Sequence, residues 1–123
     1  MGNKILIVDD NNQDRMIMER LLNKAGFSEI ICAERGEEGV SKARSEAPDL
    51  VIIDTMLPGI DGFQTCRQVK QESSGPAPKV IVITGSIDAI DAVKARRMGA
   101  DDYCVKSSDF SSLIETIRTL LIK

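Results

Sequence analysis

Short apolar runs alternate along the chain with longer segments in which apolar residues recur every three or four positions. The runs have the length and β-branched content of strands: Ile5–Val8, Ile30–Ala33, Leu50–Ile53, Val80–Ile83 and Tyr103–Val105. Runs that are apolar at nearly every position are typical of strands covered on both faces of a parallel sheet. The pattern therefore predicts five parallel strands.

The segments between and after these runs predict five helices. They cover residues 12–25, 36–47, 62–71, 87–98 and 109–121. Gly26, Pro48 and Gly99 follow three of them and are typical helix terminators. Because crossovers between parallel strands are right-handed, the alternation predicts a doubly wound α/β fold with helices on both faces of the sheet. We predict that these elements form one domain that spans residues 1–123.

Polar residues follow four of the predicted strands. Asp9 and Asp10 come after the first strand, Asp54 after the third, Thr84 after the fourth and Lys106 after the fifth. In a doubly wound sheet, ligands bind beyond the carboxyl ends of the strands. If these strands are neighbours, we expect the five side chains to share one rim of the sheet.

This residue set suits the transfer of a phosphoryl group. Three close carboxylates repel one another unless a cation neutralises them, and Mg²⁺ accepts a few carboxylates together with water. Lys106 adds a positive charge, Thr84 can donate a hydrogen bond, and Asp54 can attack phosphorus to give an aspartyl phosphate. A strand-end aspartate alone is more often a turn or cap residue, so the prediction depends on the combination.

Composition limits the other possibilities. The 123 residues are 42% hydrophobic and 28% charged, which is typical of one globular domain. A net charge of −3 gives no broad attraction to nucleic acid or anionic membranes, so we expect neither as a direct partner. There is no histidine, and Cys32, Cys66 and Cys104 have no metal or redox spacing. No signal-peptide pattern opens the chain, so we expect a cytoplasmic protein with reduced cysteines.

Four segments form an ordered set of motifs. They are Ile-Leu-Ile-Val-Asp-Asp at 5–10, Asp-Thr-Met-Leu-Pro-Gly-Ile-Asp-Gly-Phe at 54–63, Val-Ile-Thr-Gly at 82–85 and Gly-Ala-Asp-Asp-Tyr-Cys-Val-Lys at 99–106. With these motifs, the chain resembles the receiver domain of response regulators in bacterial two-component signalling. It is similar to the single-domain chemotaxis response regulator, and the resemblance covers nearly the whole chain. It implies a flavodoxin-like sheet with the strand order 2-1-3-4-5.

The resemblance implies a role for each acidic residue of the rim. Asp54 would accept a phosphoryl group from a histidine kinase or a histidine phosphotransfer protein. Asp10 would bind Mg²⁺ directly and Asp9 largely through water, with Asp54 and the backbone carbonyl of Met56 as further ligands. Such a domain catalyses its own phosphorylation and dephosphorylation and is not a turnover enzyme.

The resemblance also implies a conformational switch. Thr84 and Lys106 would bind phosphoryl oxygens, and Tyr103 would turn inward when Thr84 moves. The face made by the fourth helix, fifth strand and fifth helix would then control a downstream protein or an output domain. Tyr103 could instead simply pack at a strand edge. Met56 and Ser86 are expected to border the site and to affect hydrolysis.

One position departs from the family pattern. The family usually has proline after the lysine, joined by a cis bond, whereas Ser107 follows Lys106 here. A cis bond before a residue other than proline costs about 2.5–4 kcal/mol. We predict a cis-like geometry for the Lys106–Ser107 bond.

Several alternatives stay open from the sequence. The domain could act alone or belong to a longer regulator or hybrid kinase. A phosphatase of the haloacid-dehalogenase type would usually carry a second aspartate where Met56 stands, and an FMN binder would not place Asp9 and Asp10 in its phosphate loop. A cobalamin-binding module would need a histidine ligand, and the sequence has none. A receiver that is folded but never phosphorylated normally lacks one of the five rim residues.

Overall fold

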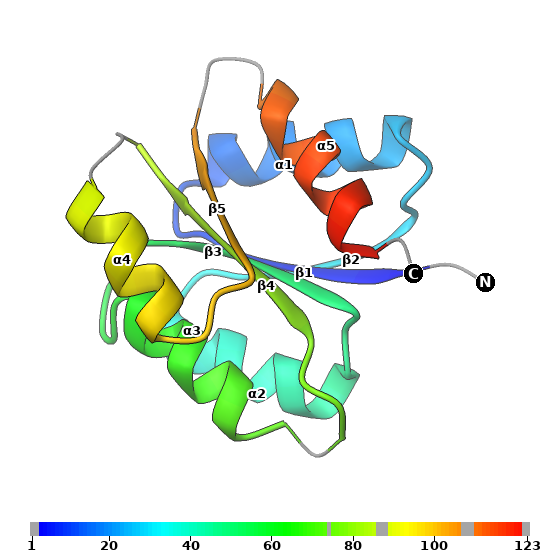
Figure 1. Cartoon of the computed structure of the whole chain (residues 1–123). Coiled ribbons are helices and arrows are strands. Elements are labelled where there is room, and N and C mark those ends of the chain that lie inside the picture. The colour runs from blue at the N-terminus through cyan, green and yellow to red at the C-terminus, as the bar shows by residue number, and fades with distance from the viewer. Residues whose placement is uncertain (1–2, 74, 86–88, 107–109, 122–123) are drawn as a thin grey trace.

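The computed structural model describes residues 3–73, 75–85, 89–106 and 110–121. Its centre is one sheet of five parallel strands (Figure 1). The strands are β1 (Lys4–Val8), β2 (Glu29–Ala33), β3 (Leu50–Asp54), β4 (Lys79–Thr84) and β5 (Asp102–Val105). They lie in the order β2-β1-β3-β4-β5. The doubly wound fold and the strand order predicted from the sequence are confirmed.

Five helices cover the two faces of the sheet. They are α1 (Asn12–Lys24), α2 (Gly36–Glu46), α3 (Gly62–Gln71), α4 (Ala89–Arg97) and α5 (Ser111–Leu121). Helices α1 and α5 lie on one face, and α2, α3 and α4 lie on the other (Figure 1). None of the described helices is long and apolar enough to cross a membrane.

Alternate strand residues supply the two cores. In β1, Leu6 and Val8 pack on the side of α2, α3 and α4, whereas Ile5 and Ile7 pack on the side of α1 and α5. All four side chains are fully buried. Because both faces of each central strand are covered, these strands are apolar at every position between their ends instead of alternating with polar residues.

Several helix boundaries differ from the sequence prediction. Helices α1 and α4 end one residue earlier than predicted, at Lys24 and Arg97, and the predicted start of the fourth helix at residue 87 lies outside the described residues.

Two further differences have a backbone cause. Ala47 is not helical but caps α2 in the left-handed conformation, with φ 48°. The residue before a proline is disfavoured in the α region, and Pro48 follows. Helix α5 was predicted from Asp109, which lies outside the described residues. It begins at Ser111, after Phe110, whose φ of 52° is incompatible with a helix and whose side chain is buried in the core.

Candidate functional site

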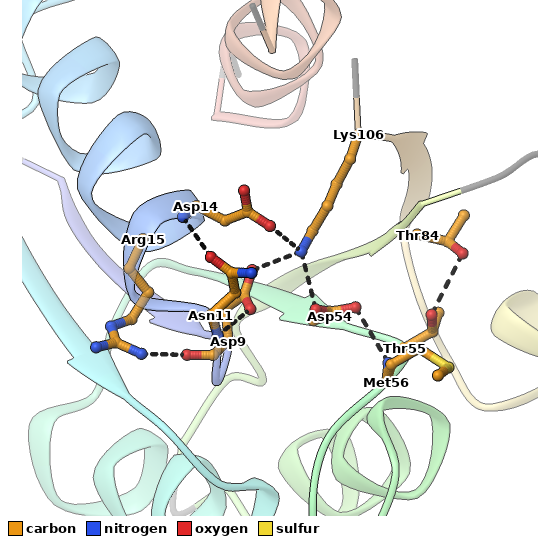
Figure 2. Close-up of polar contacts among 9 residues, drawn as sticks. All are labelled: Asp9, Asn11, Asp14, Arg15, Asp54, Thr55, Met56, Thr84 and Lys106. Carbon is orange, nitrogen blue, oxygen red and sulfur yellow. Dashed lines mark hydrogen bonds and ion pairs between the residues drawn. The ribbon is translucent and has the colours of Figure 1, made fainter. Parts of the chain in front are cut away.

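The candidate site lies at the carboxyl ends of four neighbouring strands. Asp9 follows β1, Asp54 ends β3, Thr84 ends β4 and Lys106 follows β5. Figure 2 shows Asp9, Asp54 and Lys106 meeting at one rim, whereas the nearby Thr84 hydroxyl is turned to Thr55. The parallel register brings these strand-end residues to the same edge of the sheet, as expected for neighbouring strands.

Three carboxylates meet at this rim. Asp9, Asp10 and Asp54 each offer an oxygen, and these oxygens lie within 4.8 Å of one another. Asp9 and Asp54 are buried, whereas Asp10 is exposed. The site therefore has a buried floor and one acidic residue that faces solvent.

Backbone groups hold the two buried carboxylates in place. Asp9 Oδ1 accepts a hydrogen bond from the backbone N–H of Asn11 at 2.9 Å. Asp54 Oδ1 accepts one from the backbone N–H of Met56 at 3.1 Å. In each case one oxygen is tied to the loop that follows the strand, which leaves the other oxygen directed into the site.

Lys106 occupies the space between the free oxygens (Figure 2). Its ammonium nitrogen lies 2.9 Å from both Asp9 Oδ2 and Asp54 Oδ2, and 2.7 Å from Asp14 Oδ2. Burial disfavours the charge, but the close contacts with the carboxylates of Asp14, Asp54 and Asp9 outweigh it and raise the pKa of Lys106 above its ordinary value. The side chain is therefore a cation at neutral pH.

The surroundings of Asp9 suit a second cation in addition to Lys106. Asp9 Oδ2 is buried, and within the described part of the chain it receives no well-directed hydrogen bond, although Lys106 is close. Burial raises the pKa of Asp9 to about 6, against the lowering effects of the Asn11 N–H and Lys106. A buried carboxylate oxygen that accepts no hydrogen bond, beside two more carboxylates, suits a hard divalent ion such as Mg²⁺.

The raised pKa predicts how Asp9 affects stability in the protein without metal. The ordinary pKa is 3.8 and the folded value is about 6, so the folded state holds the proton more tightly than the unfolded state. The stabilisation from this group is complete below the ordinary value and is lost as the pH rises through about 6. An asparagine at this position cannot ionise, so Asp9→Asn avoids the destabilisation at neutral pH. The substitution should raise the free energy of unfolding there by about 1–3 kcal/mol.

Urea denaturation in EDTA, at neutral pH and at about pH 4, tests this expectation. The gain from Asp9→Asn should shrink at the lower pH, where the wild-type carboxyl group is largely protonated. A variant that is no more stable than the wild type at neutral pH would show that burial does not destabilise the ionised carboxylate.

Two residues beyond those predicted from the sequence also contact the rim. Asp14, in the first turn of α1, binds Lys106. The sequence feature that could have drawn attention to Asp14 is its position three residues after Asn11, which caps the helix. Thr55 Oγ1 donates a hydrogen bond to Thr84 Oγ1 at 3.3 Å. Thr55 directly follows the predicted acceptor, but nothing in the local pattern identifies its partner.

The remaining predicted residues lie around the rim. Met56 follows the buried Asp54 and Thr55, and it is 76% exposed. Tyr103 is half-buried and packs against the apolar cluster on the side of α2, α3 and α4. Residues Ser86 and Ser107 lie outside the described residues, so the predicted geometry of the Lys106–Ser107 bond stays a prediction.

Comparison with known proteins decides the family. The family model described as the response regulator receiver domain matches residues 5–118. The chain belongs to this family. Receiver domains are phospho-accepting modules of two-component signalling, which agrees with the family predicted from the sequence motifs.

Relatives of this receiver domain include short and long proteins. PilH of Pseudomonas aeruginosa is 38% identical over 118 residues, which cover 96% of this chain and 97% of PilH. A probable transcriptional regulator of Cyanophora paradoxa, ycf27, is also 38% identical over 118 residues, but these cover 48% of that protein. The chain thus spans nearly all of one relative and about half of the other.

Solved structures agree with the fold of this receiver domain. A putative response regulator from Chloroflexus aurantiacus superposes with a TM-score of 0.92 at 29% identity, with all of both chains covered. The signal receiver domain of a histidine kinase from Syntrophus aciditrophicus gives 0.85 at 29% identity, with 98% of this chain and 90% of that chain covered.

Proposed function

We propose that Asp54 of this receiver domain accepts a phosphoryl group from a histidine kinase or a histidine phosphotransfer protein. The observation that carries the proposal is the ion pair of 2.9 Å between Asp54 Oδ2 and Lys106, beside the carboxylates of Asp9 and Asp10. We further propose that residues 1–123 form one receiver domain that controls a partner protein or an output domain.

Asp54 has the surroundings of a nucleophile. Its Oδ1 is held by the Met56 N–H, and Lys106 stabilises negative charge on the Oδ2 side. In the proposed step, an Asp54 oxygen forms a bond to phosphorus while the bond from phosphorus to the donor's leaving group breaks. The exposed Asp10 and Met56 border the acceptor, which leaves the approach of a donor open to solvent.

The rim would also hold Mg²⁺. The proposed ligands are the carboxylates of Asp9, Asp10 and Asp54, together with the backbone carbonyl of Met56. The ion would neutralise oxygens of the phosphoryl group during transfer. Lys106, as a fixed cation in contact with Asp54, would pair with another of these oxygens.

Thr84 and Tyr103 are proposed to carry the signal away from Asp54. The Thr84 hydroxyl accepts a hydrogen bond from Thr55, and a turn of Thr84 toward a phosphoryl oxygen would exchange this bond for a stronger one to a charged group. Tyr103 lies on β5, which pairs directly with the strand that Thr84 ends. The surface formed by α4, β5 and α5 is therefore the proposed output face.

We also propose a cytoplasmic location and protein partners. Cys32, Cys66 and Cys104 are all free thiols, which suits a reducing compartment. The net charge of −3 favours neither nucleic acid nor an anionic membrane as the direct partner.

Intact-protein mass measurement tests the proposal. The wild-type protein is incubated with acetyl phosphate and Mg²⁺, and a second sample contains EDTA in excess of the metal. We expect a gain of one phosphoryl group with Mg²⁺ and almost none with EDTA, since the clustered carboxylates repel an anionic donor. Wild-type protein that gains no mass with Mg²⁺ would contradict the proposed function.

A further inference from the structure

Lys106 has one partner outside the three clustered carboxylates. Asp14 Oδ2, from the first turn of α1, lies 2.7 Å from its ammonium nitrogen (Figure 2). The Asp14 and Lys106 side chains are only 26% and 16% exposed, so solvent screens this ion pair less than one on the open surface. The contact joins α1 to the end of β5.

The start of α1 directs the Asp14 side chain toward Lys106. Asn11 caps the helix and accepts a hydrogen bond from the Asp14 backbone N–H at 2.9 Å. An acidic residue at this position often reaches back to the backbone N–H of the cap residue. Here Asp9 Oδ1 already accepts from that N–H of Asn11. The carboxylate of Asp14 is therefore available to Lys106.

Arg15, the cationic residue that directly follows Asp14 on α1, has other partners. Arg15 donates to the backbone oxygen of Asp9 at 2.7 Å and to Asn12 Oδ1 at 2.9 Å. Among the residues that the structure describes, Asp14 forms its ion pair with Lys106. The Asp14 carboxylate is thus committed to the lysine of the site.

We propose that Asp14 is a positioning residue that holds the Lys106 ammonium group against Asp54. An ammonium has three N–H donors on a flexible four-carbon stem, and three carboxylates surround Lys106. Asp14 and Asp54 accept hydrogen bonds from it, and Asp9 lies 2.9 Å away as an ion-pair partner. Two of these carboxylates, Asp9 and Asp54, have proposed roles with the cation and the phosphoryl group. Asp14 has neither role, so its bond to Lys106 can persist when the other two carboxylates change partners.

This inference rests on the proposed function, and a double-mutant cycle tests it. The rate of phosphorylation by acetyl phosphate is measured for the wild type, Asp14→Asn, Lys106→Met and the double variant. Asp14→Asn should lower the rate about fivefold in the presence of Lys106, a loss typical of a partly buried ion pair. In the Lys106→Met background the same change should alter the rate by less than about twofold.

Glu19→Gln is the matched control, because it removes one negative charge from α1 at a residue that does not pair with Lys106. It should leave the rate unchanged in both backgrounds. An equal loss from Asp14→Asn with and without Lys106, or no loss at all, would overturn the positioning role. Failure of the wild type to gain a phosphoryl group would contradict the proposed function instead.

A second measurement needs neither metal nor phosphorylation. Ammonium protons held by carboxylates exchange slowly with water, so the Lys106 side chain should give a resolved ¹H–¹⁵N signal in the protein without metal. Asp14→Asn should weaken this signal through faster exchange, whereas Glu19→Gln should preserve it. A Lys106 signal of equal intensity in all three proteins would also overturn the proposal.

Discussion

Asp54→Asn should abolish phosphorylation of this receiver domain by acetyl phosphate and Mg²⁺. The amide keeps the size of the carboxylate and can still accept the hydrogen bond from the Met56 N–H, so the loop keeps its conformation. It is not a nucleophile toward phosphorus and it carries no charge for a cation. We expect the rate to fall by at least about a thousandfold, as for removal of a nucleophile from an active site.

Asp61→Asn is the matched control for this experiment. Asp61 belongs to the same loop and caps α3, with its Oδ1 accepting from the backbone N–H of Gln64 at 2.9 Å. Asparagine caps helices as well as aspartate does, so the variant loses one carboxylate without losing the cap. It should gain a phosphoryl group at a rate close to that of the wild type. A mass gain in Asp54→Asn equal to that of Asp61→Asn would place the acceptor elsewhere.

Gly62→Ala should destabilise the fold and also disturb the site. A Cβ at Gly62 would lie 2.0 Å from the backbone oxygen of Asp54 and 2.7 Å from the Cα of Thr55. These are backbone atoms, and the N–H of Gly62 donates to the Thr55 oxygen at 3.1 Å, so the clash requires movement of the β3 end or of α3. We expect the free energy of unfolding to fall by about 2–4 kcal/mol.

Gly75→Ala is the control for the loss of a glycine, because a Cβ there meets no atom within 4 Å. Urea denaturation of both variants should show a near-neutral effect at Gly75 and a large loss at Gly62. Phosphorylation of folded Gly62→Ala should also slow, since the displaced segment carries Asp54. A Gly62→Ala protein within about 1 kcal/mol of the wild type would mean that the loop adjusts easily.

Much of the site could be predicted because its residues follow strands that the sequence identifies. Ile5–Val8 and Leu50–Ile53 are buried on both faces, so their apolar runs have definite ends, and those ends place Asp9 and Asp54. Parallel pairing then brings the ends to one rim. The partners of Asp14 and Thr55 could not be predicted in the same way, because a side chain's contacts across elements leave no mark on local periodicity.

The sequence by itself determined how many strands and helices there are and how they follow one another along the chain. It also determined which polar residues stand at the strand ends. These follow from local rules: burial on two faces excludes polar residues from a strand, and glycine and proline end helices. Only the tertiary structure decided that Asp14 meets Lys106, a residue 92 positions later. It also decided that Phe110, whose side chain is buried, has a left-handed backbone conformation just before α5. Both depend on how α1, α5 and the sheet edge pack together, which no short segment of the chain specifies.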